Sequence, residues 1–235
     1  MRHSLLLLSI FSASLISPFM SMAQGQPVQG TNASKSESAS LRATAQVEGI
    51  TEFRLPNGLR VLLAPDASKP TTTLNITYLV GSRHENYGET GMAHLLEHLV
   101  FKGTPTRGNI MQELGKRGMS FNGTTFYDRT NYYQTVPNNQ LEKMLWLEAD
   151  RMGFLLDAVT QQKFEVQRGT VKNERGQNYD NRPYGLAREV TAQALYPYGH
   201  PYSWLTIGYV EDLNRVTVAD LKNANRAARV SVKLV

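Results

Sequence analysis

The chain has 235 residues, of which 41% are hydrophobic, and both values are typical of one sizeable globular domain with or without a tail. The formal net charge is +5, and no dense run of Lys and Arg occurs, which argues against a nucleic-acid partner. The absence of cysteine excludes a disulfide framework and a lipid-modified cysteine.

An N-terminal signal peptide is expected at residues 1–23. Arg2 and His3 precede an apolar stretch, and the small residues of the following Ser21-Met22-Ala23 suit a cleavage site. Four serines and a proline interrupt the apolar stretch, which argues against a stable membrane span. We therefore expect an exported protein, in a bacterial periplasm or secreted. A flexible linker rich in small polar residues is expected at residues 24–49.

A folded domain is expected from residue 50 to residue 235. Two strands, 51–55 and 59–63, flank Asn57-Gly58, a dipeptide typical of a tight hairpin turn. The next expected elements are a strand, a loop, a helix around His94 capped by Thr90, a short helix, two strands and three helices. Apart from the His94 helix, they span 72–80, 81–89, 110–117, 119–124, 130–136, 139–152, 161–178 and 184–195. This order predicts an α+β fold, with helices packed on a mixed, mostly antiparallel sheet.

The stretch His94-Leu95-Leu96-Glu97-His98 carries the strongest functional signal. In a helix, His98 lies about 40° round from His94 and Glu97 about 60° to the other side, so all three share one face. Two histidines one turn apart can bind one zinc ion, and the glutamate is placed to hold a water, as in the H-x-x-E-H signature. The alternative is a buried helix with structural histidines. Three polar groups within five apolar-flanked residues favour the metal site.

A catalytic zinc site needs a third protein ligand and an open position for water. Glu174 is the best candidate on the later helices, although the local pattern does not distinguish it from Glu165 or Asp180. His84 and His200 are expected in loops or at helix ends, and neither is given a catalytic role.

Several short motifs follow one another between Thr51 and Leu221. They are Leu55-Pro-Asn-Gly-Leu-Arg-Val61, Val80-Gly-Ser-Arg83, Gly91-Met-Ala-His-Leu-Leu-Glu-His98, Phe101-Lys-Gly-Thr104, Asn122-Gly-Thr-Thr125, Leu147-Glu-Ala-Asp-Arg-Met152, Asn181-Arg-Pro-Tyr-Gly185 and His200-Pro-Tyr202. In this set and order the chain resembles the M16 (pitrilysin-like) zinc metallopeptidases. The resemblance implies a LuxS/MPP-like metallohydrolase domain that acts on a peptide or an unfolded polypeptide.

The resemblance also implies the roles of individual residues. One zinc ion is expected on His94, His98 and Glu174, because the family's third ligand follows some 75 to 80 residues on and 174 − 98 = 76. Glu97 is expected to be the catalytic base that activates a metal-bound water. Asn122, Gly123, Thr124 and Thr125 match an edge strand near the metal that can pair with an extended peptide.

Two departures from the family pattern stand out. Seven residues before Glu174 many relatives have a second glutamate, whereas this chain has Gln167. The family's usual continuation and its second, closing domain do not follow Leu221. We therefore expect a catalytic domain truncated at its C-terminal end, or a module that relies on a second M16 domain or subunit. A zinc endopeptidase is the favoured function. The alternatives are a non-catalytic or partner-dependent peptide-binding module and a structural module without metal.

Overall fold

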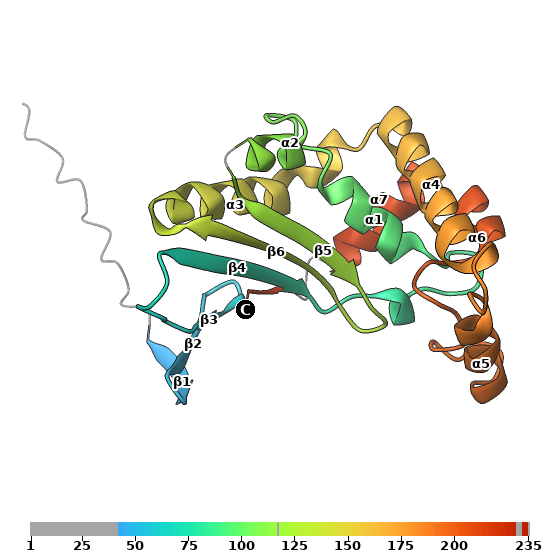
Figure 1. Cartoon of the computed structure of the whole chain (residues 1–235), viewed down its shortest axis with the longest axis horizontal. Coiled ribbons are helices and arrows are strands. Elements are labelled where there is room, and N and C mark those ends of the chain that lie inside the picture. The colour runs from blue at the N-terminus through green and yellow to red at the C-terminus, as the bar shows by residue number, and fades with distance from the viewer. Residues whose placement is uncertain (1–41, 117, 229–231, 235) are drawn as a thin grey trace, which may run out of the picture. The chain divides into compact units, whose positions relative to one another are not determined.

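The computed structural model describes residues 42–116, 118–228 and 232–234 (Figure 1). The expected signal peptide at 1–23 and residues 24–41 of the expected linker lie outside these described residues. Among the described helices, none has both the length and the apolar character that crossing a bilayer requires.

The described chain begins with a three-stranded antiparallel sheet in the order β1-β2-β3. Its strands are β1 (Ala43–Val47), β2 (Ile50–Arg54) and β3 (Arg60–Leu63). The expected hairpin at Asn57-Gly58 is confirmed. Strand β1 is a correction, since it lies within the expected linker 24–49. Glu48 and Gly49 both adopt positive φ, 49° and 84°, which makes a tight hairpin turn. All five β1 residues are exposed, so no apolar pattern marks the strand.

A four-stranded antiparallel sheet carries the rest of the strands, in the order β5-β6-β4-β7. Its members are β4 (Thr71–Tyr78), β5 (Ser120–Thr125), β6 (Thr130–Pro137) and β7 (Val232–Leu234). The strands expected at 72–80, 119–124 and 130–136 are confirmed. Residues of β6 alternate between buried and half-buried, as expected for a strand covered on one face. Strand β5 lies at the edge of the sheet as described.

Seven α-helices and three short helical turns are present in the described residues. The helices are α1 (Met92–Val100), α2 (Ile110–Gly115), α3 (Leu141–Ala158), α4 (Gln161–Arg175), α5 (Ala187–Leu195), α6 (Val210–Arg215) and α7 (Val218–Ala228). The short turns are η1 (Ser82–His84), η2 (Asn138–Gln140) and the π-helical η3 (Gly176–Asp180). Helix α3 continues past the expected end at 152 because Leu155, Leu156 and Ala158 are buried. Helices α6 and α7 were not expected from the sequence.

Two apolar clusters build the core. In one, Leu74, Ile76 and Val136 of the sheet pack with Met144 and Leu147 of α3. The other joins α1 to α4 and contains Leu95, Leu99, Phe164 and Val171 at its centre. In Figure 1, α3 runs along the β4–β6 sheet, and α1 lies between β5 and α4. The second cluster therefore fixes the helix of the histidine motif against the helix that carries Glu174.

Gly81 packs tightly against the turn between β5 and β6. An added Cβ would lie 2.0 Å from the carbonyl oxygen of Phe126 and 2.7 Å from that of Tyr127, so no side chain fits without a backbone shift. We expect Gly81→Ala to lower the free energy of unfolding by about 1–3 kcal/mol in a urea titration. Gly169→Ala is the matched control, because nothing lies within 4 Å of its added Cβ. This helical change is expected to stabilise by up to about 1 kcal/mol. Equal effects would contradict the close approach at Gly81.

Candidate metal centre

A buried carboxylate fixes the first turn of α1. Gly91 is the N-cap residue, with φ 88°, and it supplies no side-chain cap. Glu85 accepts hydrogen bonds from the backbone N–H groups of Gly91, at 3.0 Å, and Ala93, at 2.7 Å. Burial raises the pKa of Glu85 to about 8 against the opposing effect of these two donors. The first turn thus gains hydrogen-bond partners from a residue before the helix.

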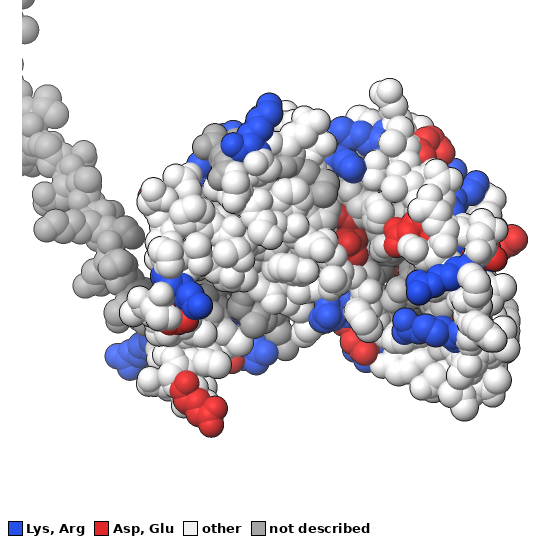
Figure 2. All heavy atoms as spheres, in the orientation of Figure 1, with Lys and Arg blue, Asp and Glu red and all other residues white. Residues whose placement is uncertain are grey.

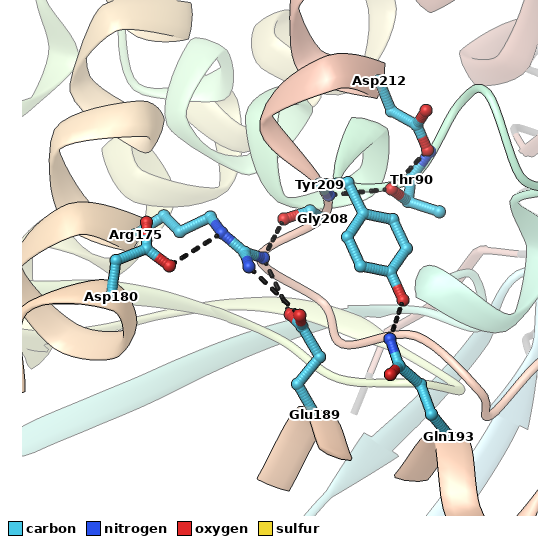
Figure 3. Close-up of polar contacts among 8 residues, drawn as sticks. All are labelled: Thr90, Arg175, Asp180, Glu189, Gln193, Gly208, Tyr209 and Asp212. Atoms are coloured by element: carbon cyan, nitrogen blue, oxygen red, sulfur yellow. Dashed lines mark hydrogen bonds and ion pairs between the residues drawn. The ribbon is translucent and has the colours of Figure 1, made fainter. Parts of the chain in front are cut away.

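The expectation that Thr90 caps this helix is wrong. The Thr90 hydroxyl donates to Asp212 at 2.7 Å and accepts from the backbone N–H of Tyr209 at 2.9 Å (Figure 3). Asp212 belongs to α6, more than a hundred positions away, so a local pattern does not reveal it. The start of α1 is therefore tied to α6.

The imidazoles of His94 and His98 and the carboxylate of Glu174 converge. The two Nε2 atoms are 3.3 Å apart, and Glu174 Oε2 lies 3.7 Å from His94 Nε2 and 3.4 Å from His98 Nε2. A tetrahedral zinc with bonds of about 2.0–2.1 Å separates its donors by roughly 3.3 Å. These three side chains are also a group whose ligand atoms all lie within 4.8 Å of one another. Their spacing fits one zinc ion.

The other two acidic residues considered as third ligand are engaged elsewhere. Glu165 is exposed and forms an ion pair with Arg168 at 3.2 Å. Asp180 lies in the π-helical turn and pairs with Arg175 at 3.4 Å. Gln167, seven residues before Glu174, is also on α4, and its side chain is buried.

The surroundings shift the pKa values of the clustered groups in different directions. Burial, with a smaller effect of His98, lowers the pKa of His94 to about 4, so that its imidazole is neutral at pH 7. The hydrogen bond to His98 lowers the pKa of Glu174 against the effect of burial. Burial raises the pKa of Glu97, although the Thr125 hydroxyl donates to it. Neutral imidazole and an ionised carboxylate are the forms that bind a metal.

Arg175, the residue after Glu174, connects α4 to two other segments (Figure 3). Its buried guanidinium donates to Glu189 of α5 at 2.9 Å and to the carbonyl oxygen of Gly208 at 2.6 Å. Gly208 in turn packs so closely on the start of α1 that an added Cβ would lie 2.5 Å from Gly91 Cα. Through Arg175 the end of α4 is held against the start of α1.

A cavity of about 420 Å³ opens over this cluster. Strand β5 forms one wall, where all four residues expected to bind substrate, Asn122 to Thr125, line it. Gly123 passes so near Glu97 that an added Cβ would lie 3.1 Å from its Oε1. The edge of the sheet thus runs directly past the carboxylate of Glu97.

Several lining residues were not found by sequence reasoning. They are Phe126, Tyr127, Tyr179, Arg188, Leu205, Thr206 and Ile207. The motif Asn181–Gly185 leads into α5 and could have drawn attention to Arg188, but no residue spacing indicates that this helix reaches the cavity.

On the face shown in Figure 2, basic and acidic side chains are interspersed.

The fold and this set of side chains are typical of the inverzincin class of metal-dependent hydrolases. A family model described as Insulinase (Peptidase family M16) matches residues 60–200, which is more than half of the chain. The chain belongs to the M16 peptidase family, as the motif resemblance implied.

Three known proteins illustrate the relationship. The zinc protease PqqE of Helicobacter pylori is 34% identical over 187 residues, which are 78% of this chain and 41% of that protein. The crystal structure of a protease from Helicobacter pylori matches with a TM-score of 0.74 and 31% identity, over 79% of this chain and 45% of that one. The periplasmic protease PqqL from Escherichia coli shares the fold, with a TM-score of 0.72, 22% identity, and coverage of 82% and 22%. The chain thus spans about two fifths of PqqE.

Proposed function

We propose that this chain is the zinc-binding part of a metalloendopeptidase. The observation that carries the proposal is the convergence of His94 Nε2, His98 Nε2 and Glu174 Oε2 at distances of 3.3–3.7 Å. These three residues would hold one zinc ion, and Glu97 lies on the same helix beside them. The relative PqqE is a zinc protease, which supports the same assignment.

Glu97 and Thr125 have chemical tasks beside the proposed zinc ion. Zinc, when bound, supplies a Lewis acid that lowers the pKa of a water molecule and polarises a peptide carbonyl. Glu97 accepts the proton of the attacking water and later delivers it to the leaving amine. Its pKa is raised by burial, which brings the carboxylate closer to the pH at which it must exchange a proton. Thr125 donates a hydrogen bond to Glu97 and so orients it.

Strand β5 is the proposed binding edge for substrate. As described, it pairs with β6 on one side and borders the cavity on the other. An extended peptide can add to such an edge through backbone hydrogen bonds, which give affinity with little dependence on sequence. The scissile bond would then lie beside Glu97, because Gly123 and Thr125 both approach this carboxylate.

A second M16 domain or subunit is proposed to complete the enzyme. The chain covers 45% of the Helicobacter pylori protease structure and 22% of PqqL, so both structures contain further parts. Export to the periplasm is proposed on the signal-like N-terminus, and the structure of PqqL, named a periplasmic protease, supports it.

Zinc content tests the proposal. The purified full chain is expected to hold about one zinc ion, measured by elemental analysis after dialysis against trace zinc. Glu174→Gln is expected to weaken zinc binding by at least about 10–100-fold in a chelator competition. Glu165→Gln is the matched control on the same helix, since that glutamate is exposed and pairs only with neighbours on α4. Equal zinc affinity of both variants would contradict the proposed ligand set.

Peptide cleavage separates enzyme from binding module. Cleavage of an unfolded polypeptide that stops with chelator and returns with zinc supports the endopeptidase. Zinc binding and peptide binding without cleavage, even after addition of a candidate second domain, would instead support the peptide-binding alternative.

A further inference from the structure

The cavity over the metal cluster contains a positive charge that the proposed chemistry does not use. Arg188 lies in the first turn of α5 and lines the cavity together with the metal cluster and β5. The residue is exposed, so its guanidinium is accessible to a ligand that enters the cavity. The carboxylates of Glu97 and Glu174 line the same cavity, so an anionic group is favoured locally, at the guanidinium of Arg188.

The side chains of three other arginines have protein partners. Arg83 pairs with Asp128 at 3.0 Å, Arg129 donates to Thr124 at 2.8 Å, and Arg175 holds Glu189. Within the part of the chain that the structure describes, Arg188 differs from them and has no ion pair or side-chain hydrogen bond. Asp128, which follows Tyr127 in the chain, and Glu189, which follows Arg188, already have arginine partners. A planar guanidinium of this kind can bind a carboxylate in a bidentate manner.

Tyr127 shows where along the binding edge Arg188 acts. Tyr127 and Arg188 line the same cavity, and the charge of Arg188 opposes the rise that burial causes in the pKa of Tyr127. Tyr127 follows Thr125 by two positions and Gly123 by four, and these two residues flank Glu97. At about 3.3 Å per residue, a peptide extended along β5 would reach Arg188 roughly 7–13 Å from the scissile bond.

We propose that Arg188 is a specificity-determining residue that selects peptides with an Asp or Glu side chain two to four residues from the scissile bond. The inference rests on the proposed function, because it places the peptide along β5 with the reacting bond at Glu97. It adds a preference that backbone pairing alone does not supply.

Binding of two matched peptides tests this inference. The fluorescently labelled peptides have no other charged side chain and differ only in one Asp or Asn, which is moved through successive positions. The zinc-loaded full chain carries Glu97→Gln to prevent turnover, and anisotropy at low ionic strength gives the dissociation constants. We expect the Asp peptide to bind about tenfold more tightly than the Asn peptide at one or two positions.

Variants of the same chain assign the preference to one side chain. Arg188→Gln is expected to remove the preference, and Arg188→Glu to reverse it, so that the Asn peptide binds more tightly than the Asp peptide. Arg182→Gln is the matched control, because this exposed arginine does not line the cavity. The inference is overturned if the parent shows no preference, if Arg188→Gln keeps it, or if neither peptide binds. Zinc-dependent cleavage of the neutral peptide tests the proposed function separately.

Discussion

Glu97→Gln is expected to abolish most peptide cleavage while the chain keeps its zinc. Positioned general acid–base groups contribute about 10²–10⁴-fold, so kcat should fall by that factor. An amide cannot accept the proton of the attacking water, whereas its oxygen still accepts the hydrogen bond that Thr125 donates to Glu97. The fold and the three nitrogen and oxygen ligand atoms are therefore expected to stay in place. Turnover of a quenched fluorescent peptide and zinc content are measured on the same preparation.

Glu142→Gln controls for the loss of one negative charge, because Glu142 is exposed in the first turn of α3. This variant is expected to cleave at the parent rate. If Glu97→Gln also cleaved at the parent rate with zinc bound, Glu97 would have no part in proton transfer. If it lost zinc as well as activity, Glu97 would be a ligand rather than a base.

Arg175→Met is expected to cause the largest loss of stability among these variants. The substitution removes a guanidinium that is only 8% exposed and leaves Glu189, Asp180 and the Gly208 carbonyl without their shared partner. Breaking a buried ion pair from one side costs about 3–5 kcal/mol. Urea unfolding monitored by circular dichroism measures the change. Zinc affinity should fall as well, since Arg175 follows Glu174 directly.

Lys172→Met is the control on the same helix. Lys172 donates to Asn214 at 2.9 Å in a solvent-exposed contact, and such surface interactions are worth at most about 1 kcal/mol. Arg175→Lys keeps the charge but loses the forked geometry that reaches two acceptors, and we expect an intermediate loss. A loss below about 1 kcal/mol for Arg175→Met would show that water replaces the guanidinium at little cost.

Local patterns in the sequence predict much of the scaffold. The Asn57-Gly58 hairpin and the alternating strands follow from two-residue periodicity and turn chemistry. The histidine motif predicts its own helix, because 3.6-residue periodicity alone brings His94, Glu97 and His98 to one side. The start of α7 could also have been predicted, because Thr217 and Asp220 have the spacing of a capping box and exchange hydrogen bonds.

Features that depend on distant residues were beyond local reasoning. Only the family resemblance distinguished Glu174 from Glu165 and Asp180, because all three are acidic residues of one helical region. Thr90 looks like a cap, but Asp212 binds its hydroxyl from α6. Arg188 lines the same cavity as Phe126 and Tyr127, which are far from it in the chain, and no spacing in the sequence indicates this.

Apolar packing and the Arg175 contacts join α1 and α4, and neither involves the side chains of His94, His98 or Glu174. In zinc fingers, by contrast, the metal supplies the folding energy, and the apoprotein is unfolded. Removal of the cation here should therefore leave a folded apoprotein with its donor atoms already gathered. Reloading would need little reorganisation, and cobalt could replace zinc as an optical reporter of the coordination geometry.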